Sequence, residues 1–150
     1  RWFFAARGPS SAIDFDIELA KKQSNENPVY YVQYAHARIA SILRKAADAG
    51  LSPAATVEGA LGEPAEAALV REIVRYPEVI ADAVAAEETQ GITAYATDLA
   101  TAFHAFYRDA RVVDVSAPER SAARLALARA AQVTLASALA LLGISAPDSM

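Results

Sequence analysis

Cysteine is absent from this chain, and histidine is scarce. Without cysteine there can be no disulfides, no thiolate nucleophiles and no cysteine-based zinc sites. The two histidines, His36 and His104, lie far apart in the sequence and alone make a weak case for a metal site. Gly59-Ala60-Leu61-Gly62 lacks the preceding strand and the lysine of a phosphate-binding loop. No serine, histidine and aspartate set has a recognisable nucleophile elbow. We therefore predict neither a catalytic centre nor a metal site in these residues.

Targeting and membrane signals are also missing. Trp2-Phe3-Phe4 is apolar but too short for a signal peptide. The longest uncharged stretch, residues 130–147, is rich in alanine and interrupted by polar residues. A membrane span wants about 20 predominantly apolar residues, so we predict a buried helix there. The chain is expected to be soluble and cytoplasmic with no membrane partner, and its start at Arg1 suggests a piece of a longer protein.

The 150 residues are the usual size of one compact domain. Hydrophobic residues make up 54% of the chain and charged residues 21%, which excludes a disordered, strongly charged class. A net charge of −4 argues against a strongly basic nucleic-acid binder. That charge is unevenly divided, because nine acidic and only two basic residues fall in 51–102. A polyanion would therefore meet the first and last thirds and avoid the middle.

Turn and capping residues divide the chain into helices. Alanine and leucine dominate, and no alternating run of β-branched residues is long enough for a confident strand. After a turn at residues 8–11, Asp14 and Asp16 are expected to be capping charges rather than a catalytic pair. Asn27 and Pro28 predict a cap and a first turn. The fold class predicted is an all-α bundle of about five helices. A short helix is expected to end near Lys22, and longer helices are expected at 28–49, 64–75, 78–88, 92–110 and 118–142, with a loop at 51–63. Glycines are expected just beyond helix ends at Gly50 and Gly143, and Gly91 is expected before the helix at 92–110. Ser116 and Glu119 predict a capping box at the start of the last helix.

The helix from residue 28 carries the pattern that indicates a function. On a helical wheel its apolar arc faces the core, and at the border of that arc lies a polar and aromatic stripe, half supported and half exposed. Phenol rings beside a guanidinium suit single-stranded RNA, because the rings stack on unpaired bases and arginine reaches phosphates or base edges. A tyrosine-rich packing seam is the alternative. The arc contains Val32, Ala35, His36, Ile39, Leu43 and Ala46; the stripe contains Tyr31, Tyr34, Arg38 and Lys45.

Two further groups bear on this surface. His36 lies inside the apolar arc and is expected to be a neutral core histidine with hydrogen-bonded ring nitrogens rather than a ligand or a base. In the second aromatic helix, Leu99, Phe103 and Phe106 share a face and are expected in the core. Tyr107, next to Arg108, borders that face. It would join the stripe if the two helices pack side by side.

The run Asn-Pro-Val-Tyr-Tyr-Val-Gln-Tyr-Ala-His-Ala-Arg-Ile at 27–39 resembles the start of the C-terminal anticodon-binding domain of arginyl-tRNA synthetases, the DALR domain. Segments 13–20, 103–107, 123–127 and 141–147 are similar to other parts of the same proteins. The resemblance implies that residues 1–26 are the end of the catalytic half or a connecting segment, and that 27–150 form the anticodon-binding bundle. Two departures are visible: Glu88-Thr89-Gln90 replaces a Pro-His pair, and the ending Asp148-Ser149-Met150 replaces glutamate and arginine.

The resemblance further implies the C-terminal module of an arginine–tRNA ligase, a class I enzyme that uses ATP and Mg²⁺ in a catalytic domain outside this chain. This piece would have no cofactor and no catalysis of its own, and its partner would be the anticodon loop of tRNA(Arg); the whole enzyme is expected to be a monomer. The alternative is a non-catalytic scaffold domain of the same fold, binding proteins through its acidic middle. The RNA-binding residues expected are Tyr31, Tyr34, Arg38, Lys45, Tyr107, Arg108 and the Met150 carboxylate end.

Overall fold

The computed structural model describes residues 1–8, 11 and 15–150. Within these residues it contains seven helices and no strand, so the all-α prediction is confirmed. Five of the helices are longer than ten residues and form the bundle, as expected. Residues 9 and 10 of the turn expected at 8–11, and Asp14, lie outside the described residues. The helices are α1 (Trp2–Ala5), α2 (Ile17–Lys21), α3 (Pro28–Asp48), α4 (Pro64–Val74), α5 (Tyr76–Ala86), α6 (Gln90–Asp109) and α7 (Pro118–Leu141).

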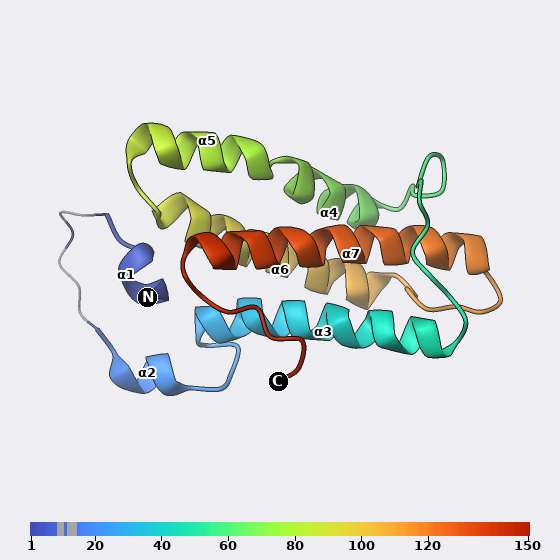
Figure 1. Cartoon of the computed structure of the whole chain (residues 1–150), viewed down its shortest axis with the longest axis horizontal. Coiled ribbons are helices and arrows are strands. Elements are labelled where there is room, and N and C mark those ends of the chain that lie inside the picture. Colours follow the sequence, from blue (N-terminus) through green and yellow to red (C-terminus); the bar gives the residue numbers. More distant parts are fainter. Residues whose placement is uncertain (9–10, 12–14) are drawn as a thin grey trace.

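The long helices α3, α6 and α7 pack against one another along the long axis of the molecule, and α4 and α5 lie along one side (Figure 1). Their facing sides meet in one core, with Leu99, Phe103 and Phe106 fully buried as predicted. The apolar arc of α3 is also buried, except for Leu43, which is half-buried. Burial of these faces is what stabilises the bundle, because helix propensity alone contributes little.

Proline and glycine mark the helix ends where the sequence predicts them. Proline occupies the first position of α3, α4 and α7, where its missing N–H costs nothing. Gly50 and Gly143 follow α3 and α7 with φ of 74° and 65°, a left-handed conformation that glycine adopts without strain. Asp16 accepts a hydrogen bond of 2.9 Å from the Leu19 amide, which confirms its capping role at α2.

Three details of the helix ends were predicted wrongly. Asn27 is at the cap position of α3, but its side-chain amide donates backward to the carbonyls of Ala20 and Lys22, at 3.1 and 2.9 Å. Ser116 forms no capping box, because its hydroxyl donates to the Asp114 carboxylate at 2.6 Å and Ala117 takes the cap position of α7. Helix α6 begins at Gln90, which places Gly91 inside the first turn rather than before it, and α5 ends at Ala86, followed by Glu87 in the left-handed region.

Helix α7 is long and apolar enough to cross a membrane by length and composition, with a mean hydropathy of 1.2 over its most apolar window. Half of that window is buried inside the bundle, against α3, α4 and α6. The buried helix predicted at 130–147 is therefore confirmed as far as Leu141, whereas residues 142–147 are a turn and an extended segment rather than helix. Beyond Gly143 the chain turns back and crosses α3 as an extended tail (Figure 1).

A buried ion pair that the sequence did not predict joins α4 to α7. The Glu66 carboxylate is 1% exposed and accepts a hydrogen bond of 2.6 Å from Arg124, itself 8% exposed. The other Glu66 oxygen accepts from the amides of Gly62 and Glu63 at the start of α4. Burial acts to raise the pKa of Glu66, but the hydrogen bonds from Glu63, Arg124 and Gly62 outweigh it and lower the pKa. Glu66 is therefore ionised in the folded protein at neutral pH.

Candidate nucleic-acid interface

The predicted stripe on α3 meets the end of α6. Tyr34 and Arg38 are one turn apart on α3, and Tyr107 is in the last turn of α6. The Arg38 guanidinium carbon is 5.1 Å from the centre of the Tyr34 ring and 5.1 Å from the centre of the Tyr107 ring. Two cation–π contacts thus hold one guanidinium, and the pairing of Tyr107 with the stripe is as expected.

Beside this stack is an open pocket of about 300 Å³, bounded by α3, the end of α6 and the C-terminal tail. Five of the seven predicted site residues line it, namely Tyr34, Arg38, Lys45, Tyr107 and Met150. The other lining residues were not among the predicted site residues. These are Ala37, Ser41, Arg44, Asp148 and Ser149.

The remaining two predicted residues lie outside the pocket. Tyr31 is half-buried, with its ring 5.0 Å from the His104 ring and its hydroxyl 3.3 Å from the Thr101 hydroxyl. Arg108 is exposed and paired with its neighbour Asp109 at 2.8 Å. The structure therefore does not bring Tyr31 or Arg108 together with the other five.

Cationic side chains outnumber anionic ones in the pocket wall, since it contains Arg38, Arg44 and Lys45 but one carboxylate side chain, that of Asp148. No hydrogen bond or ion pair joins the Arg38 guanidinium to any residue that the structure describes. The guanidinium lies against both rings and lines the pocket, so its N–H groups are available to a ligand there. In the described part of the chain, no three or more histidine and carboxylate side chains are grouped so that they could hold a metal ion.

His104 packs its ring against the aromatic rings of this surface. Its ring is 6.0 Å from Tyr34 and 5.5 Å from Phe103, in addition to its contact with Tyr31. Burial disfavours the charged imidazolium and nearby Arg38 repels it, which together lower the pKa of His104 to about 4. Its Nε2 is buried and has no hydrogen-bond partner among the described residues. The His104 ring that packs against Tyr34 is therefore neutral at physiological pH.

Acidification is expected to destabilise the fold through His104. In the unfolded chain this residue takes up a proton near pH 6.5, whereas in the folded protein it does so only near pH 4. The unfolded state therefore binds more protons between these values, and the free energy of unfolding falls as the pH is lowered through this window. Urea denaturation at pH 7 and pH 5 should show a smaller loss for His104→Phe than for the wild type; equal losses would contradict the burial of a neutral imidazole.

The His36 side chain lies in the core, as expected, at 5% exposed. Its Nδ1 is 2.9 Å from the carbonyl oxygen of Pro147 in the tail. Because a carbonyl can only accept, Nδ1 carries the proton. The partner of this histidine is thus part of the tail that bounds the pocket.

Comparison with known proteins identifies the domain. A family model described as the DALR anticodon binding domain matches residues 32–150. The chain belongs to this family. The matched residues include the whole of the pocket wall on α3, α6 and the tail, whereas Tyr31 precedes them by one position.

Individual relatives of this DALR domain agree with the family match. The chain is 46% identical to the arginine–tRNA ligase of Shouchella clausii and 49% identical to that of Dehalococcoides mccartyi, and it is covered completely in both alignments. It spans only 27% of the length of either relative. A solved arginyl-tRNA synthetase from Thermus thermophilus superimposes with a TM-score of 0.80 at 31% identity, over 99% of this chain and 25% of that one. The resemblance noted in the sequence is confirmed.

Proposed function

We propose that this DALR domain is the anticodon-binding module of an arginine–tRNA ligase, and that its pocket accepts the unpaired middle cytosine of the anticodon loop. The observation that carries the proposal is the Arg38 guanidinium, which lies against two tyrosine rings, lines the pocket and has no hydrogen-bond partner among the described residues. RNA is read mainly where bases are unpaired, and aromatic rings and arginine are the side chains used for this.

The chemistry of the guanidinium favours cytosine over uracil. Arginine has only donors, and the pairing edge of cytosine offers two acceptors, its N3 and its O2. Uracil carries a hydrogen on N3, so a donor faces a donor and that hydrogen bond is lost. A site with an unpaired buried polar group discriminates strongly against the wrong ligand. Contact with both Tyr34 and Tyr107 restricts the orientation of the Arg38 guanidinium, which is what such a distinction needs.

Lys45 is assigned to the RNA backbone. It is exposed on α3 beside the pocket and suits phosphate oxygens, whereas the neighbouring Arg44 donates to the Asp148 carbonyl. Arg108 is proposed as an outer phosphate contact, and Tyr31 as a support for His104 and an outer surface for a neighbouring base. No observation favours the alternative of a protein-binding scaffold.

Arginine–tRNA ligation would take place in a catalytic domain outside this chain, where ATP and Mg²⁺ would bind. Residues 1–26 are proposed as the end of that half or a connecting segment, and Trp2 of α1 is packed into the bundle core. The ligase is proposed to be a cytoplasmic monomer.

Lys45→Ala tests the assignment of the pocket surface to RNA. We expect weaker binding of an arginine-tRNA anticodon stem-loop irrespective of its sequence, and a salt dependence of log Kd reduced by about one in slope, because one phosphate contact is lost. Binding is measured by fluorescence anisotropy over a range of KCl concentrations. Arg71→Ala is the matched control, since Arg71 is an exposed cation on α4 outside the pocket wall. Equal slopes for Lys45→Ala and Arg71→Ala would contradict the assignment.

A further inference from the structure

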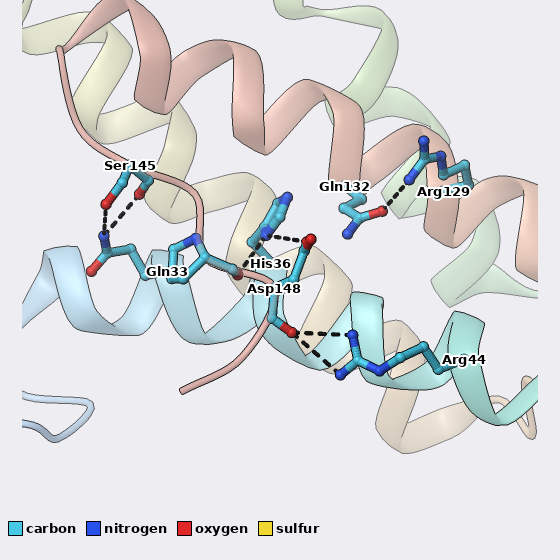
Figure 2. A network of polar contacts seen from close by, with 8 residues as sticks. Gln33, His36, Arg44, Arg129, Gln132, Ser145 and Asp148 are labelled. Atoms are coloured by element: carbon cyan, nitrogen blue, oxygen red, sulfur yellow. Dashed lines mark hydrogen bonds and ion pairs between the residues drawn. The ribbon is translucent and has the colours of Figure 1, made fainter.

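The C-terminal tail that bounds the pocket is held by side chains of α3. After the turn at Gly143, the Ile144 amide donates to the Leu139 carbonyl at 2.9 Å. From residue 145 onward, no backbone–backbone hydrogen bond holds the tail among the described residues. Its hydrogen bonds come instead from three α3 side chains, as Figure 2 shows. Gln33 donates to the Ser145 carbonyl at 2.8 Å, His36 to the Pro147 carbonyl at 2.9 Å, and Arg44 to the Asp148 carbonyl at 3.3 Å from each of two nitrogens.

All three of these α3 groups bind carbonyl oxygens of the tail. A carbonyl is present whatever the side chain, so these hydrogen bonds do not depend on the identities of residues 148 and 149; the one side-chain contact at residue 148 that Figure 2 adds is between Asp148 Oδ1 and His36 Nδ1, at 3.9 Å. The departure of the Asp148-Ser149 ending from the family pattern is therefore compatible with an unchanged path. Ile144 and Ala146 add apolar contacts with the core, which fix the near end of the tail but not its last three residues.

The last three residues of the tail line the pocket, and the helix that holds the tail also carries Tyr34 and Arg38. The same helix, α3, thus determines the position of the Arg38 guanidinium and that of the tail residues that line the pocket with it. We propose that Gln33, His36 and Arg44 are positioning residues that hold residues 148–150 at the distance from Arg38 that fits a cytosine. This inference rests on the proposed function and adds the specificity-determining role of a side-chain network that does not itself read the base.

The loss of this network should affect base discrimination more than overall affinity. A displaced tail widens the pocket, so the cytosine loses its fixed position against Arg38 while the phosphate contacts of Lys45 persist. Losing one hydrogen bond from a charged or buried donor corresponds to about a tenfold change in an equilibrium constant. We therefore expect His36→Leu and Arg44→Ala each to lower the preference for cytosine over uracil about tenfold.

The experiment uses the full-length protein and two stem-loops that differ only in the middle anticodon base. His36→Leu removes the Nδ1 donor while keeping apolar bulk, and His36→Asn restores an N–H near the Nδ1 position. We expect His36→Asn to keep the preference within about twofold of the wild type. Arg129→Ala is the matched control, because Arg129 donates to Gln132 at 2.7 Å within α7 and not to the tail (Figure 2). Hydrogen exchange of the tail amides, measured without RNA, should be faster in His36→Leu than in His36→Asn.

A double-mutant cycle separates positioning by Arg44 from a direct phosphate contact. If Arg44 acts through the tail, Arg44→Ala and Met150→Ala should be less than additive in their effect on the base preference. Additive losses would overturn the role of Arg44 in positioning, and an unchanged preference in His36→Leu would overturn that of His36. Arg38→Ala distinguishes a failure of the positioning inference from a failure of the proposed function. If it abolishes the preference while His36→Leu and Arg44→Ala retain it, only the positioning inference fails; if it too retains the preference, the proposed function fails and this inference with it.

Discussion

Replacing Arg38 by alanine is expected to weaken binding of an arginine-tRNA anticodon stem-loop roughly 10- to 100-fold. The substitution removes a pocket cation that lies against two tyrosine rings, and with it donors that have no partner among the described residues. The effect should be large because the site loses a preorganised, charge-assisted contact rather than a mobile surface charge. Affinity is measured by anisotropy or calorimetry, with circular dichroism to confirm that the helical content is unchanged.

Arg38→Lys is the informative control for that result. Lysine keeps the positive charge but has neither the planar fork nor the same stacking between Tyr34 and Tyr107. We expect Arg38→Lys to recover part of the affinity, in a salt-dependent manner, without recovering the preference for cytosine. Wild-type affinity in Arg38→Ala would show that the clamped guanidinium does not contact RNA.

The second large effect concerns stability. Removing one partner of the buried Glu66–Arg124 pair, as in Arg124→Ala, is expected to lower the free energy of unfolding by about 3–5 kcal/mol. The change leaves a buried carboxylate that keeps its two amide donors but loses its counter-charge, and it also removes the hydrogen bond to the Arg111 carbonyl. Urea denaturation of the 150-residue chain followed by circular dichroism measures the loss.

An apolar double replacement tests whether the unpaired charge causes that loss. Glu66→Leu combined with Arg124→Met removes both charges, and such exchanges are often neutral or stabilising. We expect the double variant to be more stable than Arg124→Ala. A loss below about 1 kcal/mol in Arg124→Ala would contradict a tight buried pair.

The stability that Glu66 contributes also depends on pH. The pKa of Glu66 is lowered in the folded protein, so its contribution to the free energy of unfolding is present above the unfolded pKa of 4.5 and is lost as the pH falls through the folded pKa.

The helices were predictable because their signals are local. Proline at first positions and glycine after the last turns act through backbone geometry that each residue imposes on its own. The side-chain caps were less predictable, since a polar side chain chooses among partners that the sequence does not reveal. Asn27 instead bonds two carbonyls at the end of α2, and Ser116 bonds the nearby Asp114 carboxylate.

The candidate site was predictable in part for the same reason. Tyr34 and Arg38 are one turn apart, so helical spacing alone places them on one face. The contribution of Tyr107 required α3 and α6 to pack in register, which spacing can suggest but not establish. Arg44 and His104 were missed as site residues because their roles depend on contacts with segments distant in the sequence, the tail for Arg44 and α3 for His104. No local pattern distinguishes such residues from a surface arginine and a core histidine.

The ratio of the dissociation constants of the wild-type protein for two stem-loops, one with cytosine and one with uracil at the middle anticodon position, tests the central claim most directly. We predict that the uracil stem-loop binds more weakly by about 1–3 kcal/mol, or roughly 5- to 150-fold, because the Arg38 edge meets a donor in place of an acceptor. Equal affinity for the two stem-loops would contradict it.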